Sequence, residues 1–275
     1  MSKAVFGQER VPTWFSYLFN LAREGKSAPI RFCSRKVCSR YLKLSRRSFD
    51  VVIDGIKFRL SPKNNLHDRI MMRDGKIPED SWFDDLFGPL PDNGVFVDIG
   101  ANIGVISLSA WSKARSKLRI LAIEPHPKMR ERLLNNISMN DAGETITVVP
   151  YAVGEQEGSM TLYQPSGTNL GVTTLHGDGA KNARVTFDVS VRKLTDIIDE
   201  NGISNIDLLK IDIEGYEDRA LIPFFENAQK SLWPLRVFIE HDSRARWDVD
   251  VIDHMTSIGY RVLKEDQHNM LLSLN

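Results

Sequence analysis

One stretch of ten residues constrains the fold of this chain more than any other. Residues 95–104 read VFVDIGANIG, an apolar run that ends in an acid and is followed by a turn with two glycines. Residues 105–111, VISLSAW, come directly after it. This order is typical of a buried parallel strand, a tight loop and a helix whose first turn faces a ligand. The free N–H groups at the start of that helix are suited to a polar or anionic ligand group.

The details of this loop separate two classes of ligand. A dinucleotide-binding loop reads Gly-x-Gly-x-x-Gly, and its middle glycine makes room for a pyrophosphate. Here Gly100 and Gly104 allow the turn and the close approach of the helix, but Asn102 occupies the middle position. Asp98 places a carboxylate at the end of the strand, where it would repel a pyrophosphate and pair with an α-ammonium group. The loop therefore argues against a dinucleotide.

A second acid follows the next predicted strand. The apolar run at 118–123 is followed by Glu124, and an acid in this place can accept hydrogen bonds from both hydroxyls of a ribose. S-adenosylmethionine carries an α-ammonium group and a ribose, so Asp98 and Glu124 together predict this cofactor. The alternative is that Asp98 only caps the following helix, which would leave Glu124 without a role.

Length and cysteine content set further bounds. At 275 residues the chain can form one large domain with additions or two small ones. The two cysteines, Cys33 and Cys38, are too few for a disulfide framework or a zinc site, which favours a reducing, cytoplasmic compartment. The apolar run at 14–22 is too short to cross a bilayer and has no small-residue cleavage site behind it. We therefore expect neither a membrane span nor a secretory signal.

Charge is unevenly distributed although the formal net charge is zero. Residues 1–50 contain eleven Lys and Arg against three acids, whereas the remainder contains 25 bases and 33 acids. A basic arm of this kind is suited to anionic lipid headgroups, an acidic polymer or nucleic acid. It is equally suited to the acidic body of the protein itself, and the sequence leaves these alternatives open.

The N-terminal third has its own pattern. Apolar residues recur at helical spacing over 12–25, and residues 31–47 interleave basic and apolar positions as in a second helix. Residues 49–60 alternate apolar and polar positions around Asp54-Gly55, which predicts a β-hairpin. A short helix is predicted at 81–87.

We place a boundary near residue 90, between an N-terminal extension, 1–90, and a cofactor-binding domain, 91–275. From residue 95 onwards strand and helix signals alternate, which predicts a doubly wound, mostly parallel sheet with helices on both faces. A few polar residues join the last two strands, which must therefore pair antiparallel. This arrangement resembles the class I methyltransferase fold, in which the final strand inserts beside the fifth. The predicted strands are 95–99, 119–123, 145–150, 207–213, 235–240, 260–265 and 269–274, with a helix at 127–139 between the second and third.

Residues 154–195 interrupt this alternation. Period-two patterns predict strands at 158–163 and 185–191. Between them lies a long loop, 166–182, rich in Gly, Asn, Thr and Ser, and a loop of this length is a candidate substrate lid.

A second charged strand end lies at 207–217, DLLKIDIEGYE. Ligands of open α/β sheets bind beyond the carboxyl ends of the strands, so Asp212 and Glu214 are expected to face the same crevice as Asp98 and Glu124. Buried acids need a partner or a function, and Lys210 is the expected partner of Asp212. A purely structural Lys210–Asp212 pair is the alternative.

Taken in order, the motifs at 97–104, 124–125 and 210–217 resemble the signature of the FkbM family of S-adenosylmethionine-dependent methyltransferases. The resemblance covers roughly residues 90–245 and implies O-methylation, often of a sugar hydroxyl in a polysaccharide, glycolipid or secondary metabolite. It also implies the cofactor site. By position, the methionine part would lie against Asp98, Gly100, Asn102 and Gly104, the ribose against Glu124, and the adenine near Ala152 within 151–154.

Methyl transfer to a weakly acidic hydroxyl benefits from a general base. Asp212 is the first candidate, and Glu240, His241 and Asp242 at the end of the next strand are the second candidates. Asp212 with Glu240 or Asp242 would also suit a divalent cation, although we predict no metal site.

Three other interpretations compete with a sugar O-methyltransferase. A nicotinamide-dependent oxidoreductase is disfavoured by Asn102 and Asp98. An RNA methyltransferase could use the basic arm for phosphates, but no aromatic and basic stacking platform is visible and no specific nucleic acid is expected. A relative that binds partners without catalysis is disfavoured by the presence of Asp98, Glu124 and Asp212.

Overall fold

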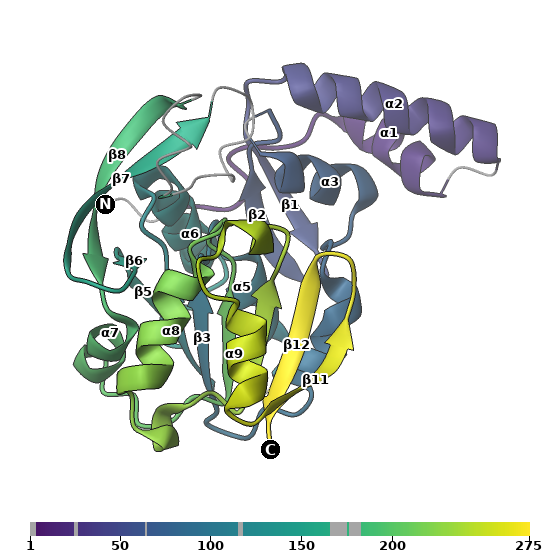
Figure 1. Ribbon diagram of the computed structural model, residues 1–275. Coiled ribbons are helices and arrows are strands. Elements are labelled where there is room, and N and C mark those ends of the chain that lie inside the picture. Colours follow the sequence, from purple (N-terminus) through teal and green to yellow (C-terminus); the bar gives the residue numbers. More distant parts are fainter. Residues whose placement is uncertain (1–3, 25–26, 64, 115–117, 166–174, 176–182) are drawn as a thin grey trace.

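The computed structural model describes residues 4–24, 27–63, 65–114, 118–165, 175 and 183–275 (Figure 1). Its centre is a seven-stranded sheet in the order β11-β12-β10-β9-β3-β4-β5. β12 is antiparallel to both of its neighbours, and the other strand pairs are parallel. The predicted fold class and the insertion of the last strand beside β10 are therefore confirmed. The strands are β3 (Val95–Ile99), β4 (Arg119–Ile123), β5 (Ile146–Val149), β9 (Leu208–Ile211), β10 (Arg236–Glu240), β11 (Tyr260–Glu265) and β12 (Asn269–Leu274).

Two apolar cores cover the two faces of this sheet. Successive side chains of a strand point to opposite faces, so Phe96 joins one core and Val97 the other. The first core holds α5 (Val105–Lys113) and α6 (Pro127–Met139), and α6 has the predicted bounds. The second core holds three helices that the sequence patterns had not delimited: α7 (Leu194–Glu200), α8 (Glu217–Asn227) and α9 (Val251–Ser257).

The N-terminal extension contains both predicted helices and the predicted hairpin. Asp54 and Gly55 have φ values of +51° and +80°, as a two-residue hairpin turn requires. A further helix, which was not predicted, starts behind the capping residue Asn65. The elements are α1 (Thr13–Glu24), α2 (Ala28–Leu44), β1 (Phe49–Ile53), β2 (Ile56–Leu60), α3 (Leu66–Asp74), the single turn η1 (Asp80–Trp82) and α4 (Phe83–Phe87).

Two asparagines, one in α6 and one at its C-cap, attach the hairpin to the sheet domain. Asn136 accepts a hydrogen bond from the Arg59 N–H at 2.9 Å, and Asn140 accepts one from the Lys57 N–H at 2.9 Å. Asn140 also donates to the Lys57 carbonyl at 2.7 Å. The boundary placed near residue 90 falls in the segment between α4 and β3, and one apolar core is continuous across it.

The two strands predicted within 154–195 are present and belong to a separate small sheet. β6 (Ala152–Val153), β8 (Ala183–Arg192) and β7 (Gly158–Pro165) pair in that order. Apart from Leu175, the loop predicted as a substrate lid lies outside the described residues. Among the helices of the described ranges, none has both the length and the apolar character needed to cross a membrane.

Candidate active site

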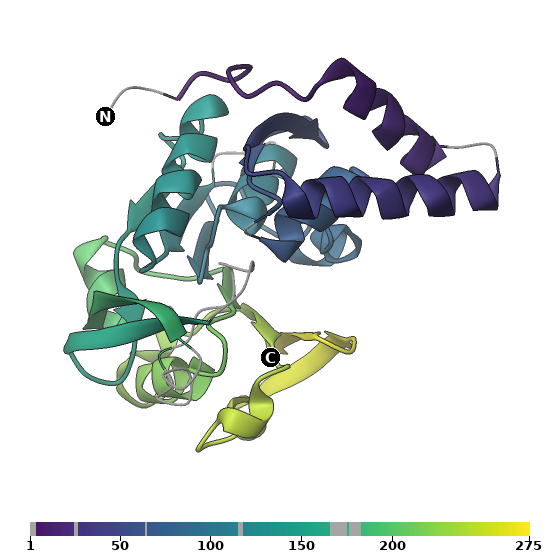
Figure 2. The ribbon, with the colours of Figure 1, turned by 90° about the horizontal axis from the view of Figure 1, so that it is seen from above.

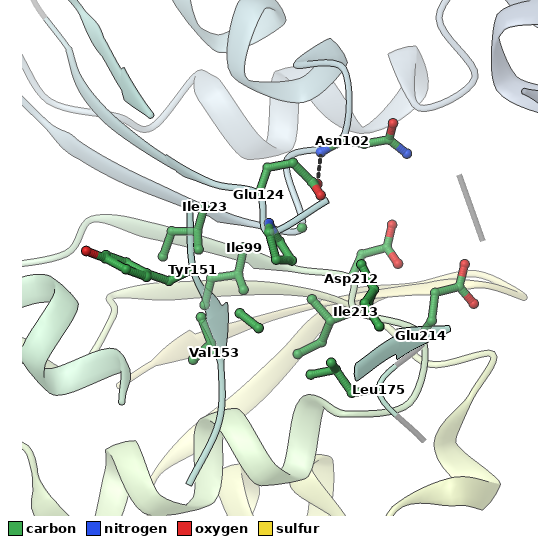
Figure 3. Close-up of a pocket in the computed structure, with 14 residues that line it drawn as sticks. Ile99, Asn102, Ile123, Glu124, Tyr151, Val153, Leu175, Asp212, Ile213 and Glu214 are labelled. Carbon is green, nitrogen blue, oxygen red and sulfur yellow. Dashed lines mark hydrogen bonds between the residues drawn. The ribbon is translucent and has the colours of Figure 1, made fainter. Parts of the chain in front are cut away.

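A pocket lies beyond the carboxyl ends of β3, β4 and β9 and is closed on one side by the small sheet. Figure 3 shows Tyr151 at one end of it and Glu214 at the other. The walls are apolar toward the small sheet and acidic toward β9. The lining residues are Ile99, Gly100, Asn102, Ile123, Glu124, Pro125, Tyr151, Ala152, Val153, Leu162, Leu175, Asp212, Ile213 and Glu214.

The glycine loop adopts backbone conformations that glycine tolerates best. Gly100 and Gly104 have φ values of +76° and +86°. A Cβ on Gly100 would overlap the main-chain oxygen of Asp212, and one on Gly104 would overlap the side chain of Leu133. The two glycines therefore allow the turn and the close packing of α5 against α6, as the sequence predicted.

Glu124 joins this loop to the second strand. Its carboxylate accepts a hydrogen bond from the Asn102 N–H at 2.7 Å (Figure 3). It accepts a second one from the His126 N–H at 2.8 Å. Burial raises the pKa of Glu124 to about 7, although both hydrogen bonds act in the opposite direction. The carboxyl group lines the pocket and is thus available to the hydroxyls of a ligand.

Asp98 lies below the pocket and does not line it. It precedes Ile99, the last residue of β3, and the alternation of the strand turns its side chain toward α5. There it accepts a hydrogen bond from the Ser107 hydroxyl at 2.6 Å, and its other oxygen is 3.5 Å from the Lys210 ammonium. The expectation that its carboxylate points into the crevice was wrong, because the alternation of side chains along β3 places Ile99 in the lining and directs Asp98 away from it. Whether Asp98 contributes to cofactor binding stays a prediction.

The loop retains an unpaired acceptor. The amide oxygen of Asn102 is buried and has no hydrogen-bond partner within the described part of the chain. A buried acceptor without a partner costs free energy that a ligand donor would recover. An α-ammonium group is such a donor, so the donor set of the loop fits the methionine part of S-adenosylmethionine.

Lys210 holds the ends of β3 and β9 together. Its ammonium donates to the carbonyls of Ile99 and Gly100 at 3.3 and 2.8 Å and lies 3.8 Å from Asp212. Burial alone would lower the pKa of Lys210, but the carboxylates of Asp98 and Asp212 raise it above its usual value. The predicted Lys210–Asp212 ion pair is present, and Asp98 is a second acidic partner of Lys210.

Asp212 and Glu214 line the pocket after β9, and Glu240 at the end of the adjacent strand β10 interacts with Asp212. Asp212 is about one-third exposed, at 34% of its side-chain surface, and hydrogen-bonds to Glu240 on the adjacent strand. Burial, with the charge and hydrogen bond of Asp212, raises the pKa of Glu240 to about 9. Burial and the neighbouring Asp212 raise the pKa of Glu214 to about 7. With a pKa of about 9, Glu240 keeps its proton at neutral pH and can donate it in a hydrogen bond to Asp212.

The structure does not bring Glu240, His241 or Asp242 into the lining of the pocket, and Glu240 reaches it only through its contact with Asp212. The His241 ring faces the C-terminal hairpin, with Nε2 3.9 Å from Glu265. Asp242 accepts a hydrogen bond from Nδ1 of His268 at 2.9 Å. Ala152 does line the pocket, as predicted. In the part of the chain that the structure describes, no group of three His, Cys, Asp or Glu residues is arranged to hold a metal ion.

Part of the apolar wall was missed from the sequence. Leu162 of β7 and Leu175 line the pocket together with Ile213. The period-two pattern of 158–163 predicted the strand that contains Leu162. Nothing in the sequence indicated which surface that strand would cover.

Three features are typical of a Rossmann-like domain that binds a nucleoside ligand. They are the mostly parallel sheet with one antiparallel insertion, the glycine turn, and the acid after the second strand. A family comparison matches residues 98–262 to the Methyltransferase FkbM domain, which is more than half of the chain. The chain therefore belongs to the FkbM methyltransferase family. The expected enzyme class and the cofactor S-adenosylmethionine are confirmed for this domain, and the oxidoreductase alternative is wrong.

Relatives of this chain include two fungal methyltransferases. Methyltransferase sdnD of Sordaria araneosa is 30% identical over 156 residues, which are 46% of this chain and 59% of the relative. Methyltransferase 1 of Beauveria bassiana is 31% identical over 148 residues, which are 47% of this chain and 57% of the relative. A crystal structure of Methyltransferase FkbM from Methylobacillus flagellatus KT aligns with a TM-score of 0.46 at 18% identity over 92% of this chain and 63% of that chain. The matches thus span less than two thirds of the relatives' lengths.

Proposed function

We propose that this protein transfers a methyl group from S-adenosylmethionine to a hydroxyl oxygen of a sugar-containing acceptor. Membership of the FkbM family supports methyl transfer, and the acid cluster supports an oxygen acceptor. The observation that carries the proposal is the Asp212–Glu240 carboxyl pair, which lies beside the pocket and includes one partly exposed member. A hydroxyl is a weak acid, so its methylation is the reaction that benefits most from such a base.

We assign the binding of the cofactor to several residues of the pocket. Glu124 would accept hydrogen bonds from the ribose hydroxyls, and Asn102 would accept one from the α-ammonium group. The apolar wall formed by Ile123, Val153 and Leu162 would enclose the adenine ring. The cofactor is a cation at its sulfonium, and the acids lining the pocket favour a cation.

Bound S-adenosylmethionine supplies an electrophilic methyl group. Asp212 is proposed to take the proton of the acceptor hydroxyl while the new oxygen–carbon bond forms and the carbon–sulfur bond breaks. Glu240 carries its own proton at neutral pH because its pKa is about 9, and it would orient Asp212 by donating a hydrogen bond to it. Lys210 would hold Asp212 in place beside the glycine loop through its hydrogen bonds to the carbonyls of Ile99 and Gly100.

A cytoplasmic location is part of this proposal. Cys33 and Cys38 are free thiols in the structure, as is usual in a reducing compartment.

Transfer of a radiolabelled methyl group tests the proposed acceptor. Polysaccharide, lipid and RNA fractions of the source cell are each incubated with labelled cofactor and with the wild-type or the Asp212→Asn protein. We expect alkali-stable label in a carbohydrate-containing fraction with the wild type and almost none with the variant. Label in RNA alone would refute the sugar acceptor and favour the RNA methyltransferase alternative.

A further inference from the structure

The geometry points to a membrane-binding surface on the N-terminal helices. We assign to the outer face of the α1–α2 hairpin the binding of an anionic phospholipid surface. The hairpin extends beyond the body of the protein in both views (Figures 1 and 2). We define the hairpin face by the exposed residues Trp14, Tyr17, Ile30, Lys36, Val37, Arg40, Lys43 and Leu44.

The two sides of α2 differ sharply. Its inner side buries Ser34, Cys38 and Leu42, which follow one another at helical spacing and pack toward the rest of the extension. Its outer side carries an apolar row at seven-residue spacing. Ile30, Val37 and Leu44 in this row are 46%, 54% and 68% exposed.

A basic row runs along the same outer side. Lys36, Arg40 and Lys43 lie beside the apolar row, and α2 contains no acidic residue. None of the three forms a salt bridge with an acid of the described ranges, although Lys36 lies 4.3 Å from the Phe32 ring centre. Arg35, in contrast, pairs with Asp74 of α3 at 3.1 Å. Lys36, Arg40 and Lys43 therefore have no acidic partner among the described residues and are available to anionic headgroups.

Aromatic residues of α1 extend the apolar row. The Trp14 ring is 59% exposed and packs edge-on against Tyr41 of α2, with ring centres 5.1 Å apart. Tyr17, one turn along α1, is 67% exposed. Trp and Tyr side chains are suited to the headgroup boundary of a bilayer because they combine an apolar ring with a polar group.

The combination favours lipid over nucleic acid. Burial of exposed aliphatic side chains such as Val37 and Leu44 at the acyl boundary is favourable, whereas proteins that bind nucleic acids use aromatic rings to stack on the bases.

The pocket and the hairpin lie toward the same end of the molecule. In Figure 1 the chain end that follows β12 lies at the bottom, so β12 runs downward. β10 is antiparallel to β12, so β10 and the strands parallel to it run upward. Their carboxyl ends and the pocket thus lie toward the end of the molecule that carries the hairpin. Membrane binding itself does not depend on the proposed methyl transfer.

Vesicle sedimentation of the full chain tests this surface. Vesicles of phosphatidylcholine alone are compared with vesicles that also contain phosphatidylglycerol, at low and physiological salt. We expect the protein to sediment with the anionic vesicles only, and less so as salt increases. Binding should also shift the tryptophan emission to the blue, and Trp14→Phe should abolish that shift. Equal binding to neutral vesicles, or binding to an RNA oligonucleotide but not to vesicles, would overturn the assignment.

Charge variants separate the hairpin face from the general charge of the protein. The triple variant Lys36→Gln, Arg40→Gln, Lys43→Gln should weaken binding to anionic vesicles on the order of a hundredfold. The matched control removes three exposed cations elsewhere: Lys128→Gln, Lys193→Gln and Arg261→Gln. The control should bind within a few-fold of the wild type. Equal losses in both triple variants would show that the hairpin face is not the binding surface, and thermal unfolding of each variant reveals any loss of fold.

Discussion

Gly100 and Asp212 meet backbone to backbone, so closely that a Cβ at residue 100 would occupy the position of the Asp212 main-chain oxygen. The Asp212 N–H also donates to the Ile99 carbonyl at 3.2 Å. The two motifs that the sequence singled out are therefore in direct contact. The position of the proposed base depends on the conformation of the cofactor loop.

This contact predicts a large effect for Gly100→Ala. The left-handed φ of +76° alone costs an alanine about 1–2 kcal/mol, and the overlap adds about 1–3 kcal/mol. Gly55→Ala is the matched control, because Gly55 has a φ of +80° but a Cβ at this position would meet nothing within 4 Å. Urea unfolding should show a larger loss for Gly100→Ala, and calorimetry with S-adenosylhomocysteine should show lost affinity for that variant only. Equal destabilisation by both substitutions would contradict the contact.

Lys210 is predicted to contribute strongly to stability. Lys210→Met leaves the buried Asp98 carboxylate without its cation, which should lower the free energy of unfolding by about 3–5 kcal/mol. Lys264→Met breaks the exposed Lys264–Asp85 pair, 2.6 Å long, and should cost at most about 1 kcal/mol.

The double variant Asp98→Asn, Lys210→Met identifies the cause of that loss. It removes the unpaired charge, so it should recover part of the stability in urea unfolding. A double variant less stable than Lys210→Met alone would mean that Asp98 is not the group that Lys210 neutralises.

Glu124 is predicted to make cofactor binding depend on pH near neutrality. Its pKa is raised to about 7, so the carboxylate that accepts ribose hydrogen bonds is lost as the pH falls below that value. Affinity for S-adenosylhomocysteine should fall by roughly tenfold from pH 8 to pH 6, because ionisation declines about tenfold per pH unit below the pKa. Glu124→Gln should bind more weakly and with a flat pH profile, as measured by calorimetry.

In the ligand-free protein, the raised pKa of Glu124 makes the folded state less stable as the pH rises, whereas cofactor binding becomes stronger. Because burial raises the pKa of Glu124 from 4.5 to about 7, the folded state holds a proton that the unfolded state has released. The associated stability is present below about pH 4.5 and is lost as the pH rises through 7. Unfolding of the ligand-free wild type should show this loss relative to Glu124→Gln, and parallel pH profiles would contradict it.

Local patterns sufficed for much of the fold. The turn at Asp54-Gly55 and the bounds of α6 followed from residues close in sequence. The antiparallel insertion of β12 followed from the short connection after β11. The strand predicted at 207–213 ends earlier, at Ile211, which leaves Asp212 in the loop where it lines the pocket.

What the sequence could not supply was the direction of individual side chains. Alternation along β3 directs Ile99 toward the pocket and Asp98 toward α5, and the His241 ring lies toward Glu265 of the C-terminal hairpin. The bonds from Asn136 and Asn140 to β2 join segments about 80 residues apart. Such contacts depend on tertiary packing, which no local pattern encodes.

The carboxyl pair at the pocket predicts opposite results for two similar substitutions. Asp212→Asn removes the proposed base and should lower kcat by about 10²- to 10⁴-fold, with little change in S-adenosylhomocysteine affinity. Glu240→Gln should keep kcat within a few-fold, because an amide resembles the protonated carboxyl that a pKa of about 9 maintains at neutral pH.

The pH profile of the same pair distinguishes catalysis from structure. Above about pH 9 the wild-type Glu240 loses its proton, which places a second negative charge beside Asp212 and ends its hydrogen-bond donation. Methyl-transfer rates should therefore change near pH 9 in the wild type and not in Glu240→Gln. If Asp212→Asn and Glu240→Gln lose activity equally at neutral pH, then the two carboxyls do not divide the roles of base and proton-bearing partner as proposed.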